Sequence, residues 1–310
     1  MSRPAIGVML PRDLDAHQVQ TFVRRAEELG FDELWIVEDL GFRGGIAQAG
    51  AVLAWTERIR VGIGILPAGA RNAAFAAMEL ATLAQLFPGR IDAGIGHGMP
   101  DWMRAVGAWP SRPLGALEAH VTAVRTLLAG GALDSDVHLD STAVPSERPP
   151  LLLGVRGPKS LALSGRIADG TVLAEPVTPE YARAAVARID AASPHRLVAY
   201  NVGVVDADAA AALATARPGL AAIGEPDWAP HIEPLPFAAE FAALRARCAD
   251  GAEFARTMPD EWVRQLALVG TAAQVRARID ELAGAGVHSS VFIPVGDSLA
   301  ALESLAAVLD

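Results

Sequence analysis

Short apolar runs alternate with longer amphipathic stretches along the whole chain. This alternation predicts repeated βα units, in which a buried strand is followed by a helix that packs over it. We expect eight strands, at Ala5–Leu10, Asp32–Val37, Ile59–Leu66, Arg90–Ile95, Leu151–Val155, Gly170–Ala174, Arg196–Val204 and Ser289–Pro294. We expect helices at His17–Leu29, Ile46–Trp55, Ala73–Leu86, Met99–Val106, Leu114–Leu128 and Thr271–Ala283, with a helical, alanine-rich region over Asp206–Arg264.

Eight strands with helices between them fit right-handed parallel crossovers. The predicted fold is therefore α/β, a (β/α)8 TIM barrel with insertions after strands 4 and 7. Part of the first insertion, Gly130–Pro150, has no clear periodicity and is expected to be a surface excursion. No linker composition divides the 310 residues, so we expect residues 1–310 to form a single barrel domain.

Composition limits the classes of partner. The formal net charge is −10, and binding to nucleic acid or an anionic membrane needs clustered cations, so we expect neither partner. Cys248 is the only cysteine, which excludes an intrachain disulfide and a multi-cysteine metal site. No segment resembles a signal peptide or sustains about 18 apolar residues without charge, so we expect a cytoplasmic protein.

The ends of the predicted strands carry the candidate chemistry, because catalytic groups of a (β/α)8 barrel lie at the C-terminal ends of its strands. The candidates are Asp39 after strand two, Gly64 and Ile65 in strand three, Gly96, His97 and Gly98 after strand four, Gly154, Val155, Arg156, Gly157, Pro158 and Lys159 after strand five, and Glu175 after strand six. Gly64 is unusual inside a buried strand, where glycine often marks a bulge or the close approach of a ligand. A simple packing role for this glycine is the alternative.

The segment after strand five is the best candidate for an anion site. Gly157 and Pro158 at a helix start leave free amides pointing outward, with the positive end of the helix behind them. Arg156 and Lys159, the only lysine of the chain, add positive charge. An ordinary turn with solvated cations is the alternative.

Among the seven histidines, only His97 falls at a strand end beside glycines, whereas His17, His120 and His195 are expected on surfaces. We therefore treat His97 as a candidate proton donor or acceptor, since its ordinary pKa is near neutrality. Asp39 is a second catalytic candidate, although it could equally cap the following segment. One histidine with scattered carboxylates lacks the spacing of metal ligands, so we expect no metal site.

These segments together resemble the bacterial-luciferase-like superfamily of luciferase-like monooxygenases and F420-dependent oxidoreductases, most closely its methylenetetrahydromethanopterin reductase branch. The resemblance covers nearly the whole chain through the order and spacing of its motifs. The quoted segments are GFDELWIVED at 30–39, IRVGIGI at 59–65, ATLAQLFPGR at 81–90, GIGHG at 94–98, LGVRGPK at 153–159, IADG at 167–170 and VGT at 269–271.

The resemblance implies a barrel that binds coenzyme F420, or alternatively FMN, at its C-terminal mouth. It also implies a non-prolyl cis peptide behind the ring, which by position matches Gly64-Ile65. The family's phosphate contacts match Gly154, Arg156, Gly157 and Lys159. Its ring and side-chain contacts match Asp39, Gly96, His97 and Gly98. Dimers formed through the early helices are the family habit, so we expect a homodimer.

Three departures from the family pattern bear on the substrate. Leu40 stands where many members have histidine, and Met99 stands where an acid often follows the glycine run. The acid that methanogen reductases carry in strand one is missing from Val8-Met9-Leu10. These replacements argue against sugar-phosphate and pterin substrates and leave the identity of the small-molecule substrate open.

The predicted function is hydride transfer between coenzyme F420 and a small organic substrate, with the protein binding, orienting and excluding water. A reduced-FMN monooxygenase is the alternative enzyme, because both would use the same barrel mouth. A non-catalytic flavin-binding protein is an alternative of another class. A Schiff-base aldolase is disfavoured, because it needs a lysine inside a strand and Lys159 follows one.

Overall fold

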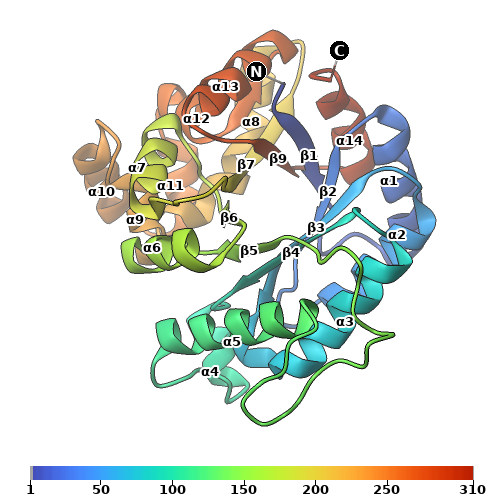
Figure 1. Ribbon diagram of the computed structural model, residues 1–310. Helices are drawn as coiled ribbons and strands as arrows, with labels where there is room; N and C mark the ends of the chain where they lie inside the picture. The colour runs from blue at the N-terminus through green and yellow to red at the C-terminus, as the bar shows by residue number, and fades with distance from the viewer. Residues whose placement is uncertain (1–2, 310) are drawn as a thin grey trace.

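A ring of parallel strands forms the centre of the molecule (Figure 1). The computed structural model describes residues 3–309. The strands are β1 (Ala5–Met9), β2 (Glu33–Ile36), β3 (Arg60–Pro67), β4 (Ile91–Gly96), β5 (Leu151–Gly154), β6 (Gly170–Leu173), β7 (Arg196–Val205), β8 (Leu268–Gly270) and β9 (Ser289–Pro294). The ring closes because β6 pairs with β7, β7 with β9, and β9 with β1. The prediction of a (β/α)8 barrel is confirmed.

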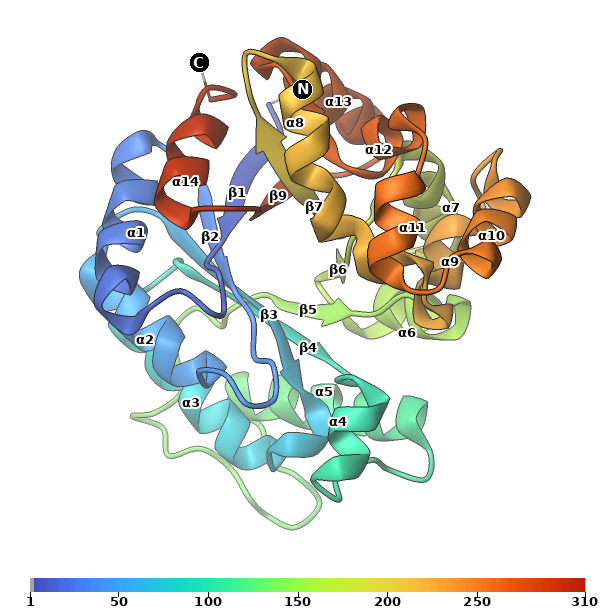
Figure 2. The same cartoon turned by 180° about the vertical axis from the view of Figure 1, so that it is seen from behind.

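Helices surround the ring on the outside (Figures 1 and 2). Those of the first half are α1 (Ala16–Leu29), α2 (Gly45–Trp55), η1 (Ala68–Ala70), α3 (Ala73–Leu86), α4 (Pro100–Ala105), α5 (Pro113–Leu128) and α6 (Pro158–Ile167). Those of the second half are α7 (Pro179–Ile189), α8 (Ala209–Ala216), η2 (Arg217–Gly224), η3 (Pro226–Trp228), α9 (Ala229–Ile232), α10 (Ala238–Arg247), α11 (Gly251–Thr257), α12 (Asp260–Leu266), α13 (Ala272–Gly284) and α14 (Ser298–Ala306). None of the helices within residues 3–309 has the length and apolar character needed to cross a bilayer.

The two predicted insertions are present. The first holds α4, α5 and an irregular stretch before β5, and the second holds the helices from α8 to α12. The second insertion also contains β8, a three-residue strand that the sequence analysis did not predict. Its residues pair with Gly203–Val205, the last part of β7. The strand β8 therefore extends one side of the sheet and is not one of the eight strands that close the barrel.

The N-terminal end of the strands encloses a buried charge cluster in the barrel interior. Glu33 and Asp92 are at most 2% exposed, and both form ion pairs with Arg196. Asp92 also receives a hydrogen bond from Arg60 at 2.6 Å, and Glu33 receives one from Ser289 at 2.6 Å. These partners compensate for the desolvation of the two carboxylates. The cluster therefore fills the end of the barrel that carries no candidate site residue, and its role is structural.

An apolar layer lies next to the charge cluster, nearer the C-terminal ends of the strands. Trp35, Leu152, Val198 and Val291 are fully buried, and Tyr200 packs edge-on against Trp35 with ring centroids 5.8 Å apart. The barrel is therefore filled with side chains up to the level of Tyr200. Only the C-terminal ends of the strands are left to form a site.

Candidate active site at the barrel mouth

The floor of the mouth is formed by the middle of β3. Gly64 and Ile65 are partly exposed, although the neighbouring Ile63 and Leu66 are buried. The peptide bond between Gly64 and Ile65 is cis, as the resemblance implies. The pairing of β3 with β4 shifts register between Ile63 and Leu66. The sequence prediction that Gly64 marks a bulge is confirmed.

Three glycines of the neighbouring strands make room for Ile65. A Cβ atom on Gly154 would collide with the Ile65 side chain, and one on Gly96 would lie 3.1 Å from it. A Cβ atom on Gly94 would collide with the carbonyl oxygen of Ile63. The glycines at 94, 96 and 154 are therefore required by the bulge itself, which gives the glycine-rich strand ends a definite structural role.

Tyr200 lies directly behind Gly64. A Cβ atom on Gly64 would collide with the Tyr200 hydroxyl, so only glycine fits at this position. The Tyr200 hydroxyl is buried and has no hydrogen-bond partner among the described residues. Burial, together with the negative charges of Glu33 and Glu175, holds the pKa of Tyr200 well above its ordinary value. The hydroxyl is thus a protonated donor without an acceptor, and sequence reasoning did not single it out.

The segment after β5 turns into α6 at the mouth. Gly157 is the N-cap residue and Pro158 begins the helix, but no side chain caps it. A side chain added at Gly157 would meet open space, and Lys159 beside it is exposed. Val155, in contrast, is buried in the core. The uncapped start of α6 leaves amide groups and the positive end of the helix facing outward, as predicted.

Arg156 has partners in the second insertion. Its Nη1 donates to the backbone carbonyl of Asp227 at 3.0 Å, and its guanidinium lies 5.0 Å from the Trp228 ring centroid. These contacts join the start of α6 to η3, about seventy residues later in the chain. Arg156 is thus partly engaged within the protein, and Lys159 is the more open of the two predicted cations.

The two acids after β2 have different surroundings. Asp39 forms an ion pair with Arg12, which lies over the ring of Phe42 at 4.8 Å. Glu38 accepts a hydrogen bond from the amide of Gly45 at 2.6 Å and pairs with Arg71. Glu38 therefore joins the β2 loop to α2, whereas Asp39 stays at the mouth with its charge balanced by a neighbouring loop.

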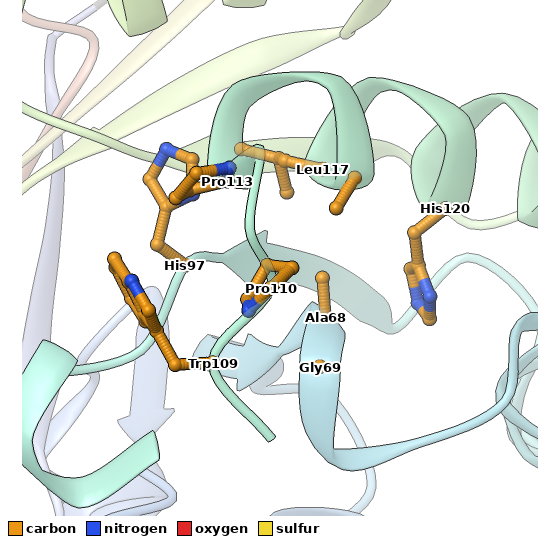
Figure 3. A pocket seen from close by; sticks show the side chains of 9 residues that line it. Ala68, Gly69, His97, Trp109, Pro110, Pro113, Leu117 and His120 are labelled. Carbon is orange, nitrogen blue, oxygen red and sulfur yellow. The ribbon is translucent and has the colours of Figure 1, made fainter. Parts of the chain in front are cut away.

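His97 connects the mouth to a small cavity (Figure 3). Its Nε2 lies 3.2 Å from the hydroxyl of Ser160, in the first turn of α6. The cavity beside it has a volume of about 110 Å³ and is lined by Ala68, Gly69, His97, Trp109, Pro110, Pro113, Ala116, Leu117 and His120. Burial lowers the pKa of His97, so the imidazole is neutral at pH 7.

His120, which was expected on a surface, is half-buried. It lies on α5, is only partly exposed, and faces His97 across the cavity in Figure 3. Burial and the charge of Arg71 lower its pKa, so this imidazole is also neutral. His120 follows the buried Leu117 by three positions, and this helical spacing is the sequence feature that could have identified it.

Glu175 follows β6 and is the remaining candidate at the mouth. Its side chain is partly exposed, and its own backbone amide donates to the carboxylate. Burial raises the pKa of Glu175, and the charge of Asp39 raises it further, while Arg156 and Arg12 act in the opposite direction. These three charged residues lie on the segments that follow β1, β2 and β5.

Metal ligands do not gather at the mouth. Within residues 3–309 there is no group of three or more histidine, cysteine, aspartate or glutamate side chains that could hold a metal ion.

Known proteins resemble this chain over most of its length. The 5,10-methylenetetrahydromethanopterin reductase of Methanolobus tindarius is 28% identical over 292 residues, covering 88% of this chain and 89% of the relative. The coenzyme F420-dependent tetrahydromethanopterin reductase of Methanopyrus kandleri has a similar structure, with a TM-score of 0.79, 22% identity and 98% coverage of both chains. An F420-dependent secondary alcohol dehydrogenase in complex with an F420–acetone adduct aligns with a TM-score of 0.75 and 19% identity, covering 99% of this chain and all of that one.

The sequence profile of the luciferase-like monooxygenase family matches residues 2–289. This match extends from β1 to the start of β9 and includes the bulge, the glycine-rich strand ends and the β5–α6 segment. The resemblance drawn from the sequence motifs is confirmed, and the chain belongs to the luciferase-like monooxygenase family.

Proposed function

We propose that the chain binds coenzyme F420 across the mouth of the barrel and transfers a hydride between it and a small organic substrate. Membership of the luciferase-like monooxygenase family makes the protein an oxidoreductase. The relative from Methanolobus tindarius is a reductase, which supports hydride transfer over oxygenation.

The bare floor at Gly64 and Ile65 is the observation that carries the proposal. These two residues are partly exposed in the middle of β3, and Gly96 and Gly154 keep the surrounding strand ends free of side chains. A planar tricyclic ring can contact such a surface closely. This floor fits a deazaflavin or flavin ring, with His97 and Asp39 at its edge.

The start of α6 fits the charged tail of the same cofactor. Gly157 has no capping side chain, and the amides of Lys159 and Ser160 donate to no backbone carbonyl within residues 3–309. Unpaired amides at a helix N-terminus bind phosphate readily, and Lys159 adds a positive charge. When bound, F420 supplies the ring carbon that carries the hydride, and the protein supplies binding, orientation and exclusion of water.

Titrating the purified protein separately with oxidised F420 and with FMN, followed by ring fluorescence, tests the cofactor. We expect saturable binding of F420. Tight binding of FMN with none of F420 would contradict the proposal and favour a reduced-FMN monooxygenase. Turnover of bound F420 with an added acceptor or donor then distinguishes an enzyme from a non-catalytic flavin-binding protein.

We also propose that the protein is a homodimer formed through α2 and α3. Phe75 and Met78 on α3 are 64% and 51% exposed, and adjacent apolar side chains on a surface commonly mark an interface. Changing both to aspartate should convert a dimer to a monomer in light scattering coupled to gel filtration. The matched control is Val106→Asp, which alters an exposed apolar residue elsewhere.

A further inference from the structure

The small cavity beside His97 is bounded by segments that follow β3 and β4. Ala68 and Gly69 of η1 form one wall, and the loop before α5 and the first half of α5 form the others. A Cβ atom on Gly69 would lie 2.5 Å from the carbonyl oxygen of Ala108, so only glycine lets η1 approach this loop so closely. The cavity is therefore closed on this side by a tight backbone contact.

The lining of the cavity is apolar and carries no charged group. None of the nine residues that line it is an arginine, lysine, aspartate or glutamate. Trp109 and two prolines supply rigid apolar surface, and the guanidinium of Arg104 lies 5.3 Å from the Trp109 ring centroid, which helps to hold that ring in place. A charged ligand would lose its hydration here without gaining a countercharge, so the lining favours an uncharged ligand.

The two histidines lie at opposite ends of the cavity (Figure 3). The Nε2 atom of His97 lies 3.2 Å from the Ser160 hydroxyl, so one of its two ring nitrogens already has a partner. His120 is half-buried and forms no hydrogen bond within residues 3–309. Its neutral imidazole offers one N–H donor and one nitrogen acceptor. The end of the cavity at His120 can therefore bind a polar atom of a ligand.

The volume of the cavity limits the size of that ligand. It measures about 110 Å³, whereas a cavity of about 150 Å³ holds benzene. One small ring can enter this space, but a fused tricyclic ring cannot. The cavity is thus distinct from the floor at Gly64 and Ile65, on which we place the cofactor ring.

We propose that this cavity binds one small, uncharged ring of the substrate, and that His120 is a specificity-determining residue that hydrogen-bonds to a hydroxyl or nitrogen of that ring. The reacting atom of the substrate then lies on the mouth side of His97. The assignment to the substrate rests on the proposed function, whereas binding of a ring in the cavity does not require F420.

Three simple probes test the class of ligand. Phenol has an uncharged ring and a hydroxyl, toluene lacks the hydroxyl, and benzoate adds a negative charge. Amide chemical shifts of η1 and α5 in NMR titrations report binding at this cavity. We expect phenol to bind with a Kd on the order of 1 mM, toluene more weakly, and benzoate not at all. No saturable shift with phenol up to about 10 mM, or tighter binding of benzoate, would overturn the proposal.

Two variants test the role of the lining. His120→Leu should weaken phenol binding by about 2–10-fold and leave toluene unchanged, and His120→Gln should recover part of the loss, because the amide also donates and accepts. Ala116→Leu should fill the cavity and abolish binding of both probes. The matched control is Ala119→Leu, an exposed position on the same helix, which should bind both probes normally. Wild-type phenol affinity in both His120→Leu and Ala116→Leu would overturn the site.

Titration with F420 separates this inference from the proposed function. If the wild type does not bind F420, the proposed function fails, whereas phenol binding at α5 still establishes the ring site. In protein saturated with F420, phenol should bind with the same or higher affinity, because the two ligands occupy different spaces. Displacement of phenol by F420 would overturn the assignment to the substrate and give the cavity to the cofactor.

Discussion

A single methyl group added at Gly154 should disturb both the stability of the barrel and its affinity for the cofactor. Gly154 ends β5 and lies against Ile65, and a Cβ atom built on it collides with the Ile65 side chain. The closest atoms belong to a branched side chain that also lies close to Gly94 and Gly96, so it cannot move towards β4. In the Gly154→Ala variant, Ile65 must shift towards the mouth.

The expected size of the effect follows from two opposing terms. Overpacking costs about 1–3 kcal/mol, whereas alanine in place of glycine recovers about 0.4–1 kcal/mol by restricting the unfolded chain, so the net loss is about 0–2.6 kcal/mol, or ~1.3 kcal/mol at the midpoints. For a chain of 310 residues this lowers the Tm by about 2–3 °C. A side chain displaced into the floor should also weaken F420 binding by at least about tenfold, or ~1.4 kcal/mol.

Differential scanning calorimetry measures the first effect and fluorescence titration with F420 the second. The matched control is Gly115→Ala on α5, where an added Cβ meets nothing within 4 Å. The control should keep its affinity for F420 and gain up to about 1 kcal/mol of stability from helix propensity. Wild-type affinity for F420 in Gly154→Ala would refute the assignment of Ile65 as the floor beneath the ring.

Three further changes test other parts of the account. Gly157→Asp should weaken binding of F420 or FMN, because it places an anion beside the uncapped start of α6. It should not lower the Tm, because the new side chain enters open space. Unchanged binding titrations would argue against this anion site. Arg196→Met should destabilise the protein by about 3–5 kcal/mol in urea unfolding, since the buried Glu33 loses its ion pair and the buried Asp92 keeps only Arg60 as a cationic partner. A loss below about 1 kcal/mol would contradict this. Burial opposes ionisation of Asp169, but hydrogen bonds from arginine side chains and a backbone amide lower its pKa to about 2. Asp169→Asn should therefore cost stability at pH 7, and the cost should shrink as the pH falls from about 4 towards 2. A loss of stability that does not depend on pH would exclude this linkage.

The repeating pattern of apolar runs was sufficient to predict the barrel, because each strand and helix is specified by local periodicity. The helix Ala73–Leu86 and the strand Ser289–Pro294 have the predicted bounds. The helix Pro179–Ile189 was left unassigned, although Thr178 caps it and Pro179 begins it. The strand Leu268–Gly270 is too short to show a period and depends on the unusual length of β7.

The candidate site was predictable only where it depends on backbone position. The rule for strand ends located the bulge at Gly64 and the start of α6. The contact of Arg156 with Trp228 and the unpaired hydroxyl of Tyr200 arise from residues distant in sequence, and no local pattern encodes such contacts. The side-chain environment of the mouth therefore required the folded structure.

A crystal structure of the protein soaked with oxidised F420 tests the central claim most directly. Our account predicts the tricyclic ring with one face on Gly64 and Ile65, and the phosphate of its tail at the amides of Lys159 and Ser160. A ring bound elsewhere, with the floor of the mouth covered by the protein's own side chains, would contradict it.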